Sequence, residues 1–476
     1  MDQWPTPDES IDPLLIFRKR PDQSAAVTVT TGQKIAVALC LLVLVAALAL
    51  DWVTTLVVIN GAAIVFYLVH ISYKFYLVWL SLGRGVEVSP SAAALTAIPD
   101  SELPKYTIQV PLYRETEVLA RLVKGLSAMD YPADKLDIQL LLEVDDDETI
   151  EAARAMDLPP QFRCVVVPDG QPKAKPRACN YGLQISDADL LVIYDAEDRP
   201  EPDQLRKAAV AFRGLPDDLV CLQARLNYYN QRQNILTRWF TQEYSVWFDL
   251  FLPGLTVSGA PIPLGGTSNH FRVPVLKALM GWDPFNVTED CDLGVRLHAH
   301  GYRSAMLDST TWEEANSAGM NWIRQRSRWV KGYIQTYLVH MRSPLGLLKS
   351  LGARGFFGFQ MTVGGSILCF LLNPIYWLMT ALWFLTHASI ISSMFPPLIF
   401  GLGLVCLFLG NFSFIYLSVA GCMQRGYHDL VKYCILTPIY WLMMSIGAYK
   451  GAFQLITRPH YWEKTQHGLF EEPEDV

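Results

Sequence analysis

The chain has 476 residues, of which 51% are hydrophobic, yet charged residues still make up 18%. This balance predicts a membrane part and a sizeable soluble part in one chain. The formal net charge of −7 argues against a nucleic-acid-binding protein, because phosphate backbones demand a basic surface. The nine cysteines are scattered and include no C-x-x-C pair, so we expect free thiols in a reducing compartment.

Two apolar segments near the N-terminus predict a transmembrane hairpin over residues 35–82. Residues 35–50 and 53–82 can each cross a hydrocarbon core of about 30 Å as a helix, provided that the first recruits its flanks. A cleaved signal peptide is the alternative for the first segment, but that segment starts late. Flanking basic residues place residues 1–34 and everything from residue 85 onward in the cytoplasm. They are Arg18, Lys19, Arg20, Lys34, Lys74 and Arg84.

Residues 85–343 combine charge with alternating strand and helix patterns. Runs rich in apolar residues at 106–110, 136–142 and 190–194 are separated by amphipathic stretches. This alternation predicts a mostly parallel sheet with helices on both faces, whose ligands bind at the carboxyl ends of the strands. Acidic residues follow the second and third runs, so we expect them at that edge of the sheet.

The acidic cluster after residues 190–194 holds Asp195, Glu197 and Asp198. Carboxylates two residues apart on a bend after a strand suit Mg²⁺ or Mn²⁺, because both ions prefer hard oxygen ligands and still coordinate phosphates. An acidic loop that is only solvated is the alternative.

The sequence QRSRW at residues 325–329 is the most informative local feature. A guanidinium group pairs with phosphate through two parallel hydrogen bonds, and an indole face binds flat apolar surfaces. Gln325, Arg326, Arg328 and Trp329 therefore suit a site that holds a diphosphate and stacks on a sugar ring.

The tripeptide Thr288-Glu289-Asp290 precedes a helical pattern. Its threonine and acids suit the N-cap and first turn of a helix, because they complement the helix dipole. The same position would let Asp290 act as a general base that takes the proton of an acceptor hydroxyl. The two interpretations are compatible.

In chain order, Asp195, the TED tripeptide and QRSRW resemble the D, D, TED, Q-R-x-R-W signature of membrane-bound processive family 2 glycosyltransferases, such as cellulose, hyaluronan and chitin synthases. The resemblance extends over residues 106–468 and is closest to short bacterial exopolysaccharide synthases of the XagB type. It implies a cytoplasmic α/β domain of the GT-A-like type, with a Rossmann-like mixed sheet, over residues 85–343. An α-helical transmembrane domain would carry it.

The resemblance also assigns donor contacts. A strand-end aspartate would contact the uridine base, which favours Asp146 with Asp145 and Glu143 as alternatives. Lys175 would contact the diphosphate. A charged turn after a strand is often only solvated, and this is the alternative interpretation of the two aspartates.

The catalytic assignments follow from the same resemblance. Asp290, with Glu289 beside it, would carry the proton transfer. Asp195 would be the firm ligand of Mg²⁺ or Mn²⁺, and either Glu197 or Asp198 would be the second.

The C-terminal part predicts further helices. Residues 344–360 are typical of an amphipathic interface helix, residues 361–420 of two transmembrane helices, and residues 433–456 of an interfacial or membrane helix. We favour four spans plus an interfacial helix over five spans. Residues 457–476 then stay in the cytoplasm, where they resemble family loops that close over the donor. The loop residues are Trp462, Lys464 and Thr465.

The implied function is an inverting transferase that polymerises a sugar from a UDP-sugar donor into an extracellular or cell-envelope polysaccharide, coupled to translocation. We expect a multi-pass protein of the bacterial inner membrane, with the growing polysaccharide as acceptor and room for partner subunits in regulation or export. UDP-glucose and UDP-N-acetylglucosamine are the leading donors, although linear motifs do not encode the sugar. The alternatives are a non-processive transferase that makes a lipid-linked sugar, and an inactive receptor or scaffold of the same fold.

Overall fold

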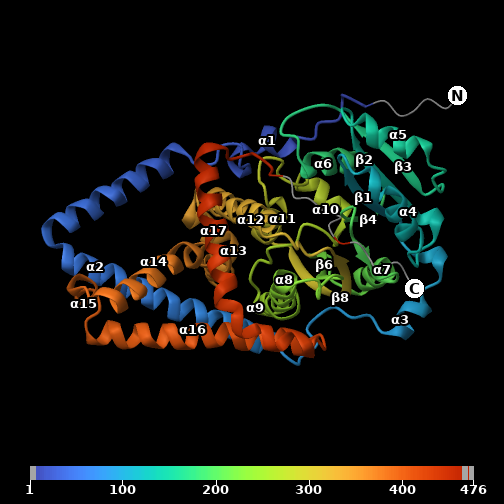
Figure 1. Cartoon of the computed structure of the whole chain (residues 1–476). Helices are drawn as coiled ribbons and strands as arrows, with labels where there is room; N and C mark the ends of the chain where they lie inside the picture. Colours follow the sequence, from blue (N-terminus) through green and yellow to red (C-terminus); the bar gives the residue numbers. More distant parts are fainter. Residues whose placement is uncertain (1–6, 464–469, 471–476) are drawn as a thin grey trace.

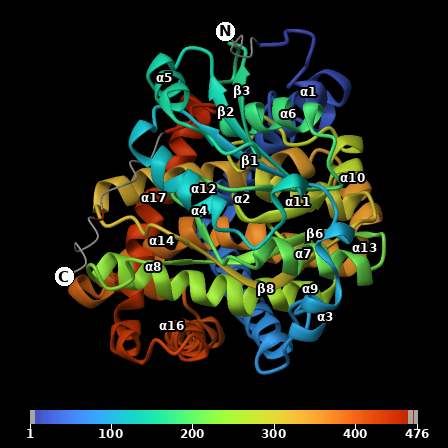
Figure 2. The same ribbon diagram turned by 90° about the vertical axis from the view of Figure 1, so that its right-hand side faces the viewer.

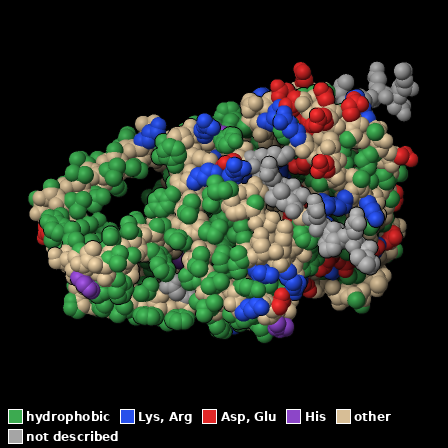
Figure 3. Space-filling view, in the orientation of Figure 1, with side chains coloured by type: hydrophobic (Ala, Val, Ile, Leu, Met, Phe, Trp, Pro, Cys, Tyr) green, Lys and Arg blue, Asp and Glu red, His purple; other side chains and the backbone are tan. Residues whose placement is uncertain are grey.

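The computed structural model describes residues 7–463 and residue 470, apart from the side chain of Asn411. It has a sheet part with flanking helices and a bundle of long helices that extends to one side (Figure 1). Acidic and basic side chains gather on the sheet part, whereas hydrophobic side chains cover most of the bundle (Figure 3). This division matches the composition, which predicts a soluble part and a membrane part.

The sheet has eight strands in the order β3-β2-β1-β4-β7-β6-β8-β5. β1 pairs in parallel with β2 and β4, whereas β7 is antiparallel to both of its neighbours. The predicted Rossmann-like mixed sheet is thus confirmed. The strands are β1 (Tyr106–Leu112), β2 (Leu136–Glu143), β3 (Phe162–Val167), β4 (Leu190–Ile193), β5 (Arg199–Pro200), β6 (Leu219–Tyr228), β7 (Asn269–Arg272) and β8 (Arg303–Glu313).

The central strands are buried along nearly their whole length, and the buried residues include polar ones as well as apolar ones. On one face, the buried amides of Gln109 and Gln139 form a hydrogen bond of 3.3 Å. α6 (Lys175–Ile185) approaches this face at Gly182, where a Cβ atom would lie 2.5 Å from Oε1 of Gln139. This close approach places the first turn of α6, with Lys175, at the carboxyl edge of the sheet.

Shorter helices connect the strands and precede the bundle. They are α1 (Leu15–Lys19), α3 (Ala92–Ala97), α4 (Leu119–Ser127), α5 (Asp147–Ala155), α7 (Gln204–Gly214), α8 (Ile235–Val246), the π-helix η5 (Trp247–Phe251), α9 (Leu252–Ser258), α10 (Val273–Ala278), α11 (Glu289–Ala299) and α12 (Gly319–His340). Short 3₁₀ turns lie at η1 (Pro21–Gln23), η2 (Asp100–Glu102), η3 (Thr116–Val118) and η4 (Ala133–Lys135).

The bundle begins with α2 (Thr31–Ser81), which is divided at Asp51 by a φ of −153° and a ψ of 93°. Its two arms diverge from this point (Figure 1). The Asp51 carboxylate accepts the backbone N–H of Thr54 at 3.0 Å and so caps the second arm. Four helical stretches of the described chain are long and apolar enough to cross a membrane: Thr31–Ser81, Pro344–Thr386, Pro397–Gln424 and His428–Thr457.

The C-terminal helices complete the bundle. They are α13 (Pro344–Phe359), η6 (Gln360–Gly364), α14 (Gly365–Thr386), α15 (Ser389–Ser393), α16 (Pro397–Gln424), η7 (His428–Leu436) and α17 (Thr437–Thr457). α14 and α16 run beside the second arm of α2, whereas α17 lies across them (Figure 1). Seen from the sheet part, α16 emerges at the edge opposite to α5 and β3 (Figure 2).

Glycines let the bundle pack closely on the sheet part. A Cβ atom at Gly451 of α17 would lie 2.5 Å from the carbonyl oxygen of Ser327 in α12. Gly254 of α9 likewise faces the backbone of Leu77 in α2, with no room for a side chain. Small residues at such crossings allow helix backbones to approach, so these contacts fix the bundle against α12 and α9.

Candidate active site

One cavity of about 490 Å³ joins the carboxyl edge of the sheet to the helix bundle. At the sheet, its wall takes side chains from the ends of β1, β2 and β8 and from the first turns of α6 and α11. Further along, α8 and α12 contribute, and the far end is lined by α2, α14, α16 and α17. The volume is in the range of small-molecule sites, about 300 to 1,000 Å³.

Glu143, the last residue of β2, lines the cavity at the sheet edge. Arg177 donates a hydrogen bond of 3.3 Å to its carboxylate, and burial raises the pKa of Glu143 to about 7. Lys173 lines the same wall and pairs at 2.6 Å with Asp145. The Tyr113 hydroxyl also donates to Asp145, at 3.4 Å. This end of the cavity therefore offers a cation, a carboxyl group and a phenol ring.

Asp146 holds the local backbone together. Its side chain is buried and caps α5, where it accepts the N–H groups of Thr149, at 3.4 Å, and Arg114. Of the three residues predicted for the uridine contact, the cavity wall includes Glu143, and neither Asp145 nor Asp146 is among its described lining residues. All three stand within four positions of one strand end, so the sequence pattern does not separate them.

Lys175, Asp195 and Asp290 come together around Gly266. The Lys175 ammonium donates to the Asp195 carboxylate and, at 2.7 Å, to the Gly266 carbonyl oxygen. A Cβ atom at Gly266 would lie 3.3 Å from Oδ2 of Asp290, so the glycine keeps this centre open. Burial disfavours the ammonium, but the charges of Asp195 and Glu289 outweigh it and raise the pKa of Lys175.

Asp195 and Glu197 line the cavity, whereas Asp198 accepts the backbone N–H of Asp195 at 2.8 Å and the Thr267 hydroxyl. Burial and the charges of these three carboxylates raise the pKa of Glu313, which favours its neutral form. Within the described ranges, no group of three His, Cys, Asp or Glu residues is placed to hold a metal. Two carboxylates still fit Mg²⁺ or Mn²⁺, because such ions take their other ligands from substrate phosphates and water.

Asp290 lies in the first turn of α11 and on the cavity wall. Its Oδ1 accepts the N–H of Cys291 at 2.7 Å. Burial raises the pKa of Asp290 to about 6, while Lys175 and Arg328 oppose this shift. The carboxylate is then the main form at neutral pH, as a general base requires. Burial and the charge of Asp290 raise the pKa of the adjacent Glu289.

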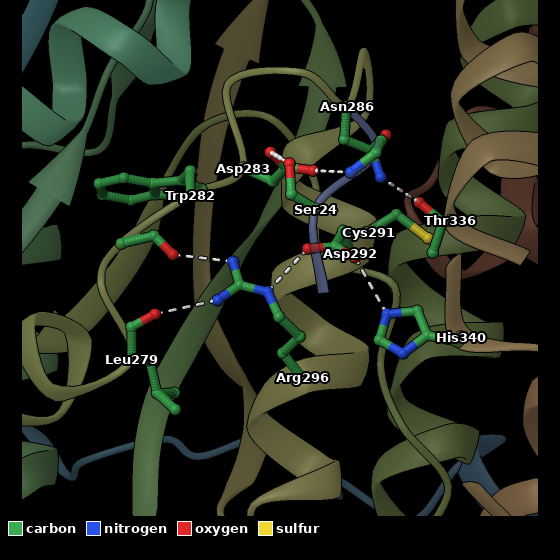
Figure 4. A network of polar contacts seen from close by, with 12 residues as sticks. Ser24, Leu279, Trp282, Asp283, Asn286, Cys291, Asp292, Arg296, Thr336 and His340 are labelled. Carbon is green, nitrogen blue, oxygen red and sulfur yellow. Dashed lines mark hydrogen bonds and ion pairs between the residues drawn. The ribbon is translucent and has the colours of Figure 1, made fainter. Parts of the chain in front are cut away.

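A polar network behind α11 fixes its position (Figure 4). Asp292 pairs with Arg296 at 2.7 Å and with His340 at 3.0 Å. Just before the helix, Asn286 donates to the Thr336 hydroxyl at 2.9 Å. Because His340 and Thr336 belong to α12, the network holds the TED and QRSRW motifs in a fixed relation.

The two arginines of QRSRW have different surroundings. Arg326 is buried, pairs with Glu243 and donates to the Tyr440 hydroxyl at 3.0 Å. Its guanidinium lies 4.4 Å from the ring centre of Phe240 and 4.4 Å from that of Trp329. Arg326 thus binds α12 to α8 and α17. The side chains of the motif that line the cavity are Gln325, Arg326, Arg328 and Trp329.

Arg328 faces the acidic centre. Burial lowers the pKa of Arg328, and the charges of Glu289, Asp290 and Asp195 oppose this shift. Its guanidinium lies 4.3 Å from the ring centre of Trp462. The Nε atoms of both arginines have no hydrogen-bond partner within the described part of the chain, but the terminal nitrogens of Arg326 are already bonded to Glu243 and Tyr440. Arg328 is therefore the arginine with donor capacity toward a ligand in the cavity.

After α17, the chain crosses α12. Backbone carbonyl groups of this segment accept hydrogen bonds from Lys331, at 2.6 Å, and from Gln335, at 3.1 Å. The crossing brings Trp462 to the cavity wall. The predicted loop residues Lys464 and Thr465 lie outside the described residues.

Several lining residues were not singled out from the sequence. Glu313 ends β8, so the strand-end rule that identified the other acids would have found it. Glu243 lies within α8 and Tyr440 within α17, and neither has a local signal. Their role depends on how both helices pack around Arg326.

A comparison with protein families covers the part of the chain that holds these residues. Residues 104–332 match the model described as Glycosyltransferase like family 2. These residues are similar to a family 2 glycosyltransferase domain. The matched range contains Asp195, Asp290 and Arg328 and ends before the helices from α13 to α17.

Curated relatives are glycosyltransferases by name. A probable glycosyltransferase YdaM of Bacillus subtilis is 29% identical over 48% of this chain and 56% of its own length. The beta-monoglucosyldiacylglycerol synthase of Synechocystis is 27% identical, over 58% and 60%. The probable glucomannan 4-beta-mannosyltransferase 1 of Arabidopsis thaliana is 26% identical, over 55% and 46%. The chain spans about half the length of these relatives.

Among solved structures, the mannosyltransferase PcManGT of Pyrobaculum calidifontis in complex with GDP-Man and Mn²⁺ matches 85% of this chain and 99% of its own. The sequence identity is 16% and the TM-score is 0.48.

Proposed function

We propose that the chain is an inverting membrane glycosyltransferase that moves a sugar from a nucleotide-sugar donor to an acceptor hydroxyl. One observation carries this proposal: a single cavity connects Lys175, Asp195 and Asp290 at the sheet edge with side chains of helices that are long and apolar enough to cross a membrane. The family 2 match over residues 104–332 supports it.

In the proposed reaction, Asp290 takes the proton of the acceptor hydroxyl, and the oxygen attacks the anomeric carbon from the side opposite to the diphosphate. The bond between that carbon and the diphosphate oxygen breaks, so the configuration inverts. Arg328 and Lys175 stabilise the charge of the leaving diphosphate. Mg²⁺ or Mn²⁺ held by Asp195 and Glu197 would neutralise more of that charge.

For the donor, we propose a UDP-sugar, with UDP-glucose and UDP-N-acetylglucosamine as the first to test. Glu143 is the strand-end acid on the cavity wall, which favours it over Asp145 and Asp146 for contact with the base. The stacking of Trp462 on Arg328 supports the proposed closure of the C-terminal segment over the diphosphate. Closure excludes water and strengthens the charged contacts.

For the acceptor, polysaccharide elongation with passage through the bundle remains the leading proposal. It rests on the QRSRW motif and on the aromatic wall at the bundle end, which includes Phe370, Phe414 and Trp441. Flat rings of this kind stack on sugars. The glucomannan mannosyltransferase among the relatives bears a name that fits such a product. We place the transferase domain in the cytoplasm and the bundle in a bacterial inner membrane.

Transfer to a lipid is the second candidate. Rings and aliphatic groups dominate the bundle end of the cavity, which also suits a lipid, and the Synechocystis relative is named for a glucosyldiacylglycerol product. The presence of Asp195, Asp290 and Arg328 in one cavity argues against an inactive receptor or scaffold.

Membranes that contain the full chain, incubated with labelled nucleotide sugars and Mn²⁺, test these proposals. High-mass labelled product supports polymerisation, and a single sugar in the organic extract supports the lipid acceptor. The Asp290→Asn variant is the matched control, because it changes one atom of the base and keeps the side-chain size. Absence of transfer from every donor by the folded protein would contradict the proposed function.

A further inference from the structure

Lys74 places a cation in the bundle end of the cavity wall. It lies on the second arm of α2, and its Nζ is 4.8 Å from the ring centre of Phe414 and 5.6 Å from those of Phe251 and Trp441. Within the described part of the chain, no hydrogen bond or ion pair reaches this ammonium group. The rings come from η5, α16 and α17, so four separate elements build this group.

These surroundings differ from those of a lysine that only sets membrane orientation. Such a lysine extends its ammonium group into the headgroup region, where water solvates it. The Lys74 ammonium instead lies among rings on the inner wall of the bundle. On the same wall, Glu243 is already bonded to Arg326 and Tyr440.

An ammonium group in an apolar wall is costly unless an anion compensates it, and ionisable residues within membrane bundles therefore mark ligand sites. Aromatic faces stabilise the cation in place without neutralising it. The arrangement thus leaves one positive charge, held in a fixed position, for an anionic group that enters the cavity.

We propose that Lys74, with Phe251, Phe414 and Trp441, binds the phosphate group of a membrane lipid that serves as the first acceptor. The inference rests on the proposed transferase function and names the acceptor class of the same cavity. A soluble phosphate shares this chemistry, but the site lies among helices that are long and apolar enough to cross a bilayer, which favours a lipid headgroup as the source of the phosphate. The rings would contact the apolar carbons next to the phosphate, and the cavity leads from there to Asp290.

Lipid retention by the purified full chain tests this assignment apart from catalysis. The protein, in a neutral detergent, is mixed with equal amounts of phosphatidylglycerol and diacylglycerol that carry the same acyl chains, and retained lipid is measured by native mass spectrometry. We expect the wild-type protein to retain phosphatidylglycerol about tenfold or more over diacylglycerol, since a hydrogen bond to a charged group contributes at least that factor. Lys74→Met should abolish the preference, whereas Lys74→Arg should keep it.

Lys34→Met is the matched control, because Lys34 lies on the same helix and is exposed. It removes the same charge and should leave the lipid preference unchanged. A preference that survives in Lys74→Met would overturn the assignment, as would its equal loss in Lys34→Met. Displacement of the lipid by glycerol phosphate at matching concentration would overturn the lipid part.

The same protein preparations separate this inference from the proposed function. If the wild-type protein retains phosphatidylglycerol through Lys74 but transfers no sugar from any donor, the transferase function fails and the anion site stands. If transfer proceeds and lipid retention does not depend on Lys74, only the acceptor assignment fails.

Discussion

Lysine side chains have different surroundings at the two ends of the cavity. At the sheet edge, each lysine is paired with a carboxylate: Lys173 with Asp145 at 2.6 Å and Lys175 with Asp195. At the bundle end, aromatic rings surround Lys74 instead. The first end can exchange its internal ion pairs for a diphosphate and a divalent cation, whereas the second has a charge that only an incoming anion would neutralise. Chemistry is therefore expected at the sheet end, and acceptor binding at the bundle end.

Among the substitutions that test this comparison, Asp290→Asn should lower turnover the most. Loss of a general base usually lowers turnover by about 100-fold or more, because proton abstraction occurs in the transition state. UDP binding should stay close to that of the wild-type protein, which equilibrium binding of labelled UDP would show. A variant that kept more than about a tenth of the activity would remove Asp290 from this role.

The arginines of QRSRW should separate into a ligand-binding and a structural residue. Arg328→Lys should lower turnover by about tenfold to 100-fold with little change in melting temperature, since a lysine cannot hold a diphosphate bidentately. Arg326→Lys should lower the free energy of unfolding by about 2 kcal/mol, because Glu243 and two aromatic rings lose their contacts with the guanidinium group. The partial exposure of Glu243 limits this loss. Thermal unfolding in detergent, measured with donor turnover, distinguishes the two. Equal stability losses would contradict the assignment.

Sequence patterns identify the sheet end because each acidic cluster directly follows a buried strand, and parallel strands bring their carboxyl ends to one edge. Those patterns cannot separate Arg326 from Arg328. The two residues share one motif on one helix, and they differ only because α8 and α17 pack against the first. Sequence patterns also do not choose between Glu143 and Asp146, because the second oxygen of Asp146 accepts the backbone N–H of Arg114, which is distant in the sequence. In the sequence, Lys74 is one of the basic residues that flank an apolar segment and indicate membrane orientation. The aromatic rings around it come from segments that are distant in the sequence.

The pH dependence of turnover should report the state of Asp290. Because burial raises the pKa of this carboxyl to about 6, the base form is complete above that value and is lost as the pH falls through it. We expect turnover to fall about tenfold per pH unit below this point. This decrease is measured as donor turnover between pH 5 and about 7.5, and thermal unfolding at each pH shows whether the protein stays folded. A flat profile to pH 5 would place the proton transfer elsewhere.

The smallest effects should come from the strand end of β2. Glu143→Gln should raise the donor KM by about threefold to tenfold with little change in kcat, because it alters a ground-state contact. Asp146→Ala should leave the donor KM near its wild-type value and lower the melting temperature, since loss of an N-cap costs about 1 kcal/mol. A reversed result would return the base contact to Asp146.

A structure of the full chain with UDP and Mn²⁺ bound, determined by electron cryomicroscopy, tests the central claim most directly. The proposed function predicts the diphosphate within hydrogen-bond distance of Arg328, the metal ion on Asp195 and Glu197, and the remainder of the cavity open toward Lys74. UDP bound outside this cavity, or a metal ion held by Asp198 with Asp195 turned away, would contradict it.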